Sequence, residues 1–354
     1  MKKPVTIITG FLGAGKTTYL NHYLEQNSAT RFAIIENEFG EQGIDSELVV
    51  RPDETIVELN NGCLCCTLND NLYDILNVLF DRRDEFDELI IEATGVADPT
   101  GLAQPFVSHP LIKEHFPLQG ILCLVDAEMI ETHLAETEEA KSQVAFSDIL
   151  LINKTDLVPE DRVDPIRQHL QRLNPLAKIT TGTKAAYPEL HFTHITSPLE
   201  KILHTAPAVP TNGEARHFPV ARPHHHHHHE HTQDLISHTF IFDEPFAAHV
   251  LERQLYIYLM LYSSGLYRMK GLVCMDGYPG QYILQSVGKR LDIEPKRSGS
   301  NGTETPQRSV LVFIGKNLPR EDIEAVLKKC LAVPTEPTGL KPGPAPPVSK
   351  KKTS

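Results

Sequence analysis

A glycine-rich segment near the start of the chain has residue types and spacing suited to binding phosphate. Gly10 is followed, after four residues, by Gly15, Lys16 and Thr17, which fits the pattern G-x-x-x-x-G-K-[ST]. In such a loop the glycines let backbone N–H groups face the phosphates, the lysine contacts the β and γ phosphates, and the hydroxyl ligates Mg²⁺. A glycine-rich turn before a surface lysine is the alternative interpretation. The predicted nucleotide-binding residues here are Gly10, Gly13, Ala14, Gly15, Lys16, Thr17 and Thr18.

The sequence Asn153-Lys154-Thr155-Asp156 indicates which base the nucleotide carries. It follows the apolar run at 148–152, which reads as a buried strand. The carboxylate of Asp156 can accept hydrogen bonds from the N1–H and the amino group of guanine, and adenine lacks this pair of donors. Asn153 can hold the pocket, and the stem of Lys154 can cover the face of the base. The motif therefore predicts GTP and disfavours a phosphate-loop kinase that uses ATP, while an ordinary polar loop is the alternative.

A further carboxylate ends another predicted strand. Glu92 follows the apolar run at 89–91, and Gly95 comes three residues later. A carboxylate in this position commonly reaches Mg²⁺ through water, and a glycine there can sense the γ-phosphate. A strand-end glutamate with no part in catalysis is the alternative. Lys16, Glu92 and Gly95 are the candidate catalytic residues.

An acidic segment follows the apolar run at 32–35. It contains Glu36, Glu38 and Glu41. Beside a phosphate site these carboxylates can bind Mg²⁺ or a second metal ion. A solvated acidic loop explains them equally well, so both interpretations stay open.

Three cysteines, Cys63, Cys65 and Cys66, crowd into four positions. This spacing is typical of a metal or redox site and not of a disulfide framework. Thiolates are soft ligands that suit Zn²⁺ or Cu⁺, and three of them leave a tetrahedral site one ligand short. An open position suits delivery of a metal better than permanent structure. Small buried thiols and a redox pair are the two alternatives.

A histidine tract is the second candidate metal-binding segment. Neutral imidazoles bind Zn²⁺, Ni²⁺, Co²⁺ or Cu²⁺ with little geometric selectivity. The tract lies between two predicted domains, where it either collects metal or is a solvated low-complexity linker. Its members are His224, His225, His226, His227, His228, His229 and His231.

Short apolar runs alternating with helical stripes must position these residues. Such runs are typical of parallel strands that are buried on both faces. The alternation predicts an α/β fold, a phosphate-loop GTPase domain with a doubly wound, mostly parallel sheet, plus a small C-terminal α+β domain. The runs lie at 4–9, 32–35, 88–91, 120–125 and 148–152, with a helical stripe at 68–79.

Composition changes divide the chain into four predicted parts. The expected parts are a GTPase domain at 1–205, a His/Pro-rich linker at 206–234, the C-terminal domain at 235–333 and a disordered tail at 334–354. The linker loses all periodicity, and the tail is rich in proline, glycine and lysine. A turn signal at 277–280 predicts a hairpin within the C-terminal domain.

Charge and hydropathy exclude two classes of partner. The 354-residue chain has a formal net charge of −12, and a general nucleic-acid binder would need a basic face. The sequence has no apolar run of about 18 residues, so no transmembrane helix is expected. The short apolar stretch at the N-terminus runs directly into the glycine loop, and we read it as the first strand of a cytoplasmic protein.

Five motifs, in order, resemble the CobW family of metal-linked GTPases, which are relatives of the UreG and HypB nickel-insertion GTPases. Two segments at 267–271 and 312–315 look like the C-terminal domain of that family. The five motifs are TGFLGAGKTT at 9–18, IENEFGE at 35–41, NGCLCC at 61–66, IEATGVADP at 91–99 and NKTD at 153–156.

The resemblance implies a function that composition alone does not give. It implies a slow GTPase that uses Mg²⁺ and delivers Zn²⁺, or alternatively cobalt, to a client metalloprotein. It assigns Cys63, Cys65 and Cys66 as ligands of the transferred metal, with Glu38 or Glu41 as helpers. A homo-oligomer is compatible with this function.

Nucleotide state can be coupled to metal affinity in such a protein. The cysteines lie in the sequence between two candidate switch loops, at 36–45 and 92–98. GTP and Mg²⁺ would order these loops and change the geometry at the thiolates. The alternative is a His-rich zinc-binding or storage protein with weak GTPase activity.

Overall fold

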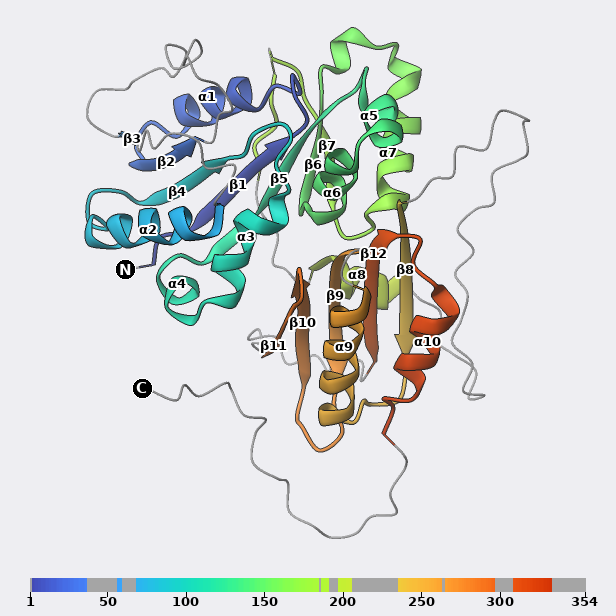
Figure 1. The fold of residues 1–354 in the computed structure, drawn as a ribbon. Helices are drawn as coiled ribbons and strands as arrows, with labels where there is room; N and C mark the ends of the chain where they lie inside the picture. The colour runs from blue at the N-terminus through green and yellow to red at the C-terminus, as the bar shows by residue number, and fades with distance from the viewer. Residues whose placement is uncertain are drawn as a thin grey trace. The chain divides into compact units, whose positions relative to one another are not determined.

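The structure is a computed structural model of the chain, and two compact units make up its fold (Figure 1). It describes residues 2–36, 56–58, 68–184, 186–190, 197–205, 235–262, 265–296 and 308–332. The first unit contains strands β1 to β7 and the second contains helices α8 to α10, and each is described by itself.

A seven-stranded sheet with the order β3-β2-β4-β1-β5-β6-β7 forms the centre of the first unit. Every neighbouring pair in it is parallel. Strands β2, β3 and β4 lie on one side of β1 and strands β5, β6 and β7 on the other, which confirms the predicted doubly wound α/β fold. The strands are β1 (Val5–Gly10), β2 (Phe32–Glu36), β3 (Ile56–Glu58), β4 (Glu88–Glu92), β5 (Leu118–Asp126), β6 (Ile149–Asn153) and β7 (Lys178–Thr181).

Helices cover both faces of this sheet (Figure 1). Helix α1 packs Tyr19, Leu20 and Leu24 onto one face, in a core cluster with Ile8 and Leu124. Helices α3 and α6 contact β1 and β5 and pack against each other. The helices are α1 (Lys16–Gln26), α2 (Leu68–Asp81), α3 (Pro99–Ser108), α4 (Pro110–His115), α5 (Ile130–Glu136), α6 (Glu138–Phe146), the 3₁₀ turn η1 (Thr155–Leu157) and α7 (Glu160–Leu173).

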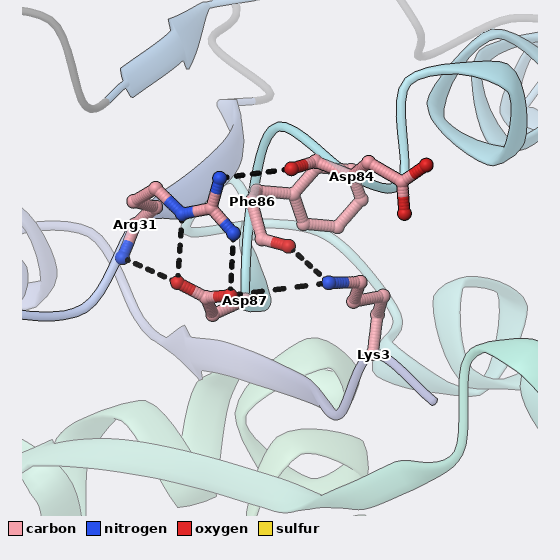
Figure 2. Close-up of polar contacts among 5 residues, drawn as sticks. All are labelled: Lys3, Arg31, Asp84, Phe86 and Asp87. Carbon is pink, nitrogen blue, oxygen red and sulfur yellow. Dashed lines mark hydrogen bonds and ion pairs between the residues drawn. The ribbon is translucent and has the colours of Figure 1, made fainter. Parts of the chain in front are cut away.

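Charged residues precede three neighbouring strands at the amino edge of the sheet (Figure 2). The guanidinium of Arg31 donates from Nε and Nη2 to the two carboxylate oxygens of Asp87, at 2.9 and 2.8 Å, and from Nη1 to the carbonyl of Asp84 at 2.8 Å. Lys3 is only 3% exposed. Its Nζ donates to the carbonyl of Phe86 and lies 3.9 Å from Asp87. These contacts join the starts of β1, β2 and β4.

The second unit is built on a five-stranded sheet with the order β11-β10-β9-β12-β8. Strand β10 pairs antiparallel with both β9 and β11. The β9–β10 connection contains Gly277 and Gly280 at φ 77° and 76°, which fits the predicted hairpin turn. Its elements are α8 (Ser197–Thr205), β8 (Leu235–Phe242), α9 (Ala248–Tyr262), β9 (Leu266–Cys274), β10 (Gln281–Val287), β11 (Arg290–Pro295), β12 (Ser309–Lys316) and α10 (Arg320–Lys328).

The predicted domain boundaries remain predictions. The boundary at 205 falls just after α8, a helix that contacts β9 of the second unit. The linker at 206–234 and the tail at 334–354 lie outside the described residues. Within the described part of the chain, no helix combines the length and apolar character needed to cross a membrane.

The described cysteines are buried and form no disulfide. They are Cys123 in β5, Cys274 in β9 and Cys330 after α10. Burial raises the pKa of Cys123 to about 12 and that of Cys330 to about 11. These thiols are therefore protonated at neutral pH.

Candidate functional site

A tight loop joins the end of β1 to the start of α1. Gly10, Gly13 and Gly15 have φ values of 141°, 75° and 96°, which side-chain-bearing residues rarely adopt. A Cβ on Gly10 would lie 2.4 Å from the carbonyl oxygen of Leu124, and one on Gly15 would lie 2.4 Å from Nδ2 of Asn153. The glycines at these two positions are therefore required by space as well as by backbone conformation. Residues 10–17 are called the phosphate loop below.

The phosphate loop directs cationic and N–H groups toward one region. Helix α1 begins at Lys16, and its N-cap, Gly15, provides no side-chain cap for the first N–H groups of the helix. The Nζ of Lys16 donates to the carbonyl oxygens of Gly10 at 3.1 Å and Phe11 at 3.4 Å. Helix N-termini and lysines both attract anions, so this arrangement can bind phosphate.

Glu92 ends β4 next to the phosphate loop. The hydroxyl of Thr17 donates to Oε1 of Glu92 at 2.8 Å, and Glu92 is 8% exposed. Hydroxyl and carboxylate oxygens are the hard ligands that Mg²⁺ prefers. The donor set therefore fits Mg²⁺, with Thr17 as a direct ligand and Glu92 available directly or through water.

The loop after β4 packs tightly on the phosphate loop. A Cβ on Gly95 would lie 2.6 Å from both the backbone nitrogen and the Cγ of Leu12. Any larger residue at position 95 would push the two loops apart. The structure thus places Gly95, a predicted catalytic residue, in direct contact with the loop that would hold the phosphates.

Asn153 ties the end of β6 to the phosphate loop. Its Nδ2 donates to the carbonyl of Ala14 at 2.9 Å, and the residue is 3% exposed. Tyr187 packs beside this contact, with its ring 5.3 Å from that of Tyr19 in α1. Asn153 thus bonds directly to the phosphate loop, and its role in holding the nucleotide pocket stays a prediction.

Lys154 and Asp156 follow Asn153 at the same edge. Lys154 has a left-handed backbone, with φ 58°, and its Nζ pairs with the carboxylate of Asp126 at 2.7 Å. Asp126 ends β5 and also accepts from the backbone nitrogen of Glu128 at 2.9 Å. Asp156 is exposed within η1, where its carboxylate is accessible for hydrogen bonds to a nucleotide base. The aliphatic stem of Lys154 is thereby fixed beside that position.

Sequence reasoning missed Asp126 and Tyr187. Asp126 follows the apolar run at 120–125, so the rule that selected Glu92, a carboxylate at the end of a buried strand, would also have selected it. Tyr187 lies in an irregular segment and no sequence signal marks it.

The predicted transition-metal ligands lie outside the described residues. Among the described residues, no group of three or more histidine, cysteine, aspartate or glutamate side chains is arranged to hold a metal ion. The acidic residues, thiols and histidines concerned are Glu38, Glu41, Cys63, Cys65, Cys66, His224, His225, His226, His227, His228, His229 and His231.

Two family models match the chain. Residues 4–181 match the model described as CobW/HypB/UreG, nucleotide-binding domain. Residues 235–331 match the model described as Cobalamin synthesis protein cobW C-terminal domain. The first range spans β1 to β7, and the second spans β8 to α10.

Individual relatives align over nearly the whole chain. The chain is 34% identical over 327 residues to the zinc chaperone YjiA of Escherichia coli (strain K12), covering 91% of this chain and 96% of that protein. It is 31% identical over 344 residues to zinc-regulated GTPase metalloprotein activator 1 of Schizosaccharomyces pombe, covering 90% and 83% of the two chains. The crystal structure of Zn(II)-bound YjiA GTPase from E. coli matches with a TM-score of 0.66 and 31% identity, covering 94% of this chain and 100% of that one.

Proposed function

The chain belongs to the CobW/HypB/UreG family, and from this premise we propose that it is a GTPase that binds zinc and delivers it to a client protein under nucleotide control. Membership confirms the family resemblance predicted from the five motifs and, with it, GTPase activity. One observation carries the proposal. The phosphate loop, Glu92 and Asn153 meet at the carboxyl edge of one parallel sheet, where such folds bind their ligands.

In this proposal the carboxyl edge binds GTP. The N–H groups of the phosphate loop and the start of α1 hold the phosphates, and Lys16 exchanges its carbonyl contacts for phosphate oxygens. Asp156 accepts hydrogen bonds from guanine, and Lys154 covers the base because Asp126 fixes its Nζ. Asn153 holds the backbone of the phosphate loop in position.

Hydrolysis uses the same edge. Mg²⁺, when bound, neutralises charge that develops on the phosphates. Thr17 and Glu92 are the residues that would hold it, since their oxygens already lie 2.8 Å apart. Because Gly95 has no side chain, the loop after β4 can lie in contact with the phosphate loop. In this position the loop after β4 can respond to the presence of the γ-phosphate.

Zinc is the proposed cargo, and Cys63, Cys65 and Cys66 are its proposed ligands. Thiolates suit Zn²⁺, and a three-thiolate site retains a position for exchange with a client. Support comes from the relatives, which carry the names zinc chaperone and zinc-regulated GTPase metalloprotein activator. Glu38, Glu41 and the His tract are proposed as auxiliary ligands.

The test is the affinity for Zn²⁺ in two nucleotide states. Purified protein is titrated against a chromogenic zinc chelator, once with Mg²⁺ and a non-hydrolysable GTP analogue and once with GDP. We expect the affinity for Zn²⁺ to differ between these two states. A triple Cys63→Ser, Cys65→Ser, Cys66→Ser variant should lose the tight site. The control is Cys330→Ser, which removes a buried thiol of the second unit and should leave zinc binding unchanged. Equal zinc affinities in the two states would exclude nucleotide control.

The competing hypothesis is a His-rich zinc store with weak GTPase activity. Deletion of residues 224–231 separates the two, because a store would lose most bound zinc while a chaperone would keep one tight thiolate site. Competition with Co²⁺ in the same assay tests whether cobalt is an alternative cargo.

The client and the cellular setting are further parts of the proposal. A cytoplasmic location is proposed for the chain. Metal analysis of proteins retained by the GTP-loaded chain would identify the client and its metal together. Size-exclusion chromatography with light scattering, with GTP analogue and with GDP, tests whether the chain forms a homo-oligomer.

A further inference from the structure

Helix α6 is a short helix that buries three polar side chains, those of Lys141, Ser142 and Gln143. All residues from Ala140 to Phe146 are buried, and Gln143 is 1% exposed. A buried amide is costly unless its hydrogen-bonding groups find partners. The partners of Gln143 therefore indicate why this side chain occupies the interior of the domain.

The amide of Gln143 is bonded to the loop that follows β4. Its Nε2 donates to the carbonyl oxygens of Gly95 at 3.1 Å and Ala97 at 3.2 Å. Nε2 carries two hydrogens, so it can donate to both carbonyls of this loop at once. A peptide unit is planar, so fixing these carbonyls also fixes the direction of the N–H groups that follow them. Gly95 is the residue that packs directly against Leu12 of the phosphate loop.

The helix that carries Gln143 is itself held firmly. Nδ2 of Asn174, a residue that is 0% exposed, shares its two hydrogens among the carbonyl oxygens of Val144 at 2.8 Å, Ala145 at 3.2 Å and Ser147 at 2.9 Å. These contacts satisfy carbonyl groups at the C-terminus of α6 that lack partners within the helix. The C-terminal end of α6 is thus held by contacts outside the nucleotide site, and Ser142 of the same helix donates to Oδ1 of Asp98 at 2.7 Å.

We propose that Gln143 is a positioning residue for GTP hydrolysis, which holds the 95–97 loop in the geometry that responds to the γ-phosphate. It acts through Gly95 and touches neither nucleotide nor metal. Its two bonds keep the loop against Leu12, so the loop is arranged before GTP arrives and loses less conformational freedom when it binds. The inference rests on the proposed role of Gly95.

A purely structural role makes a different prediction. If Gln143 only stabilises the fold, its loss lowers stability, and turnover falls only by the fraction of protein that unfolds. If it positions the loop, kcat for GTP falls while the affinity for GDP, which has no γ-phosphate, stays the same. Discrimination between a GTP analogue and GDP falls as well, and this readout does not depend on turnover.

The test compares Gln143→Met, which keeps the length of the side chain and removes both donors, with the wild-type chain. We expect kcat to fall about 10-fold or more from the loss of two buried hydrogen bonds. The affinity for GDP should remain within about 2-fold, and the ratio of GTP-analogue to GDP affinity should decrease. Gln143→Leu is a second variant without donors, in case the first does not fold.

Ser147→Ala is the matched control. Ser147 is buried in the same region, and its hydroxyl donates to the backbone carbonyl of Gln143 at 2.6 Å. It should lower thermal stability and leave kcat unchanged. An unchanged kcat and affinity ratio in folded Gln143→Met would overturn the inference, and so would equal losses of kcat in the control. Absence of GTP turnover in the wild-type chain would instead count against the proposed function, and the affinity ratio would still decide the role of Gln143.

Discussion

The two edges of the seven-stranded sheet hold their polar groups in different ways. At the amino edge, Arg31 and Asp87 form a two-pronged pair, and Lys3 is buried beside them (Figure 2). At the carboxyl edge, Lys16 donates to carbonyl oxygens, and Thr17 donates to a carboxylate. Both edges contain ion pairs and contacts to backbone carbonyls. They differ in that a two-pronged pair joins opposite charges at the amino edge, whereas the lysine of the phosphate loop donates to neutral carbonyl oxygens.

This difference suggests that the amino edge of the sheet contributes to stability and the carboxyl edge to ligand binding. Charge-assisted, two-pronged bonds are strong and directional, so the amino edge is suited to fixing the strand starts. A carbonyl oxygen is a weaker partner for an ammonium group than a phosphate oxygen is, so the contacts of Lys16 can be exchanged for those of a ligand. We therefore expect substitutions at the carboxyl edge to change nucleotide affinity and substitutions at the amino edge to change stability.

The largest effect on affinity is expected from Gly15→Ala. The new Cβ would lie 2.4 Å from Nδ2 of Asn153, at a backbone φ of 96°. About 2 kcal/mol of backbone strain alone corresponds to a loss of GTP affinity of roughly 30-fold or more. Titration with a fluorescent GTP analogue measures it. Gly13→Ala is the matched control, because φ is also positive there but nothing lies within 4 Å of its Cβ, so its loss should be smaller.

Asn153→Ala should have the next largest effect. It removes the donor to the carbonyl of Ala14, which leaves a buried acceptor without that bond. A cost of about 1.4 kcal/mol would lower the affinity for GTP and GDP alike by roughly 10-fold. Parallel titrations with the two nucleotides check this. A loss confined to GTP would contradict a role in holding the phosphate loop.

Asp126→Asn should have a smaller effect at the same edge. The carboxylate of Asp126 fixes Nζ of Lys154, and a partly exposed ion pair of this kind contributes less than about 1 kcal/mol. We expect GTP affinity to fall by about 3-fold, and the loss should shrink at high salt. Titrations at low and high ionic strength measure both effects. An unchanged affinity would show that Lys154 needs no fixed Nζ to cover the base.

Asp87→Asn should leave nucleotide affinity unchanged and lower stability. The hydrogen-bonded Arg31 guanidinium lowers the pKa of Asp87 to about 2 from an ordinary value of 3.8. Because the folded-state pKa is the lower one, the stabilisation is fully present above about pH 4 and is lost as the pH falls toward about 2.

Urea unfolding of the wild-type chain and Asp87→Asn, followed by circular dichroism from about pH 3 to about pH 7, tests this pH dependence. The difference in unfolding free energy should be constant above about pH 4 and should shrink below it. A difference that grew on acidification would contradict the sign. A change in the GTP affinity of Asp87→Asn at neutral pH would contradict the expectation that substitutions at the amino edge leave nucleotide binding unchanged.

Much of the fold could be predicted from short apolar runs. The runs at 32–35 and 88–91 correspond to β2 and β4, because strands buried on both faces are apolar at nearly every position. The carboxyl ends of parallel strands lie at one edge of a sheet. The sequence alone therefore suffices to place Glu92 and Asn153 near the phosphate loop, where their hydrogen bonds are found.

Other elements gave no such signal. Helix α6 buries Lys141, Ser142 and Gln143. Lys141 pairs with Glu138 of the same helix, whereas Ser142 and Gln143 bond to the distant segment at 95–98. Periodicity cannot reveal a helix whose interior face is polar. Gln143 was missed for the same reason, since its partners lie 46 and 48 residues away in the sequence. Only the packed structure brings these groups together.

The buried state of Cys123, Cys274 and Cys330 has a practical consequence for following the cargo. These thiols are shielded and protonated, and alkylating reagents attack exposed thiolates. Brief labelling of the native chain should therefore leave these three thiols unmodified. If the cysteines of the NGCLCC motif bind zinc as proposed, zinc should protect them from the reagent. Counting labelled thiols by mass spectrometry would give metal occupancy directly, with the buried cysteines, exposed by denaturant, as an internal standard.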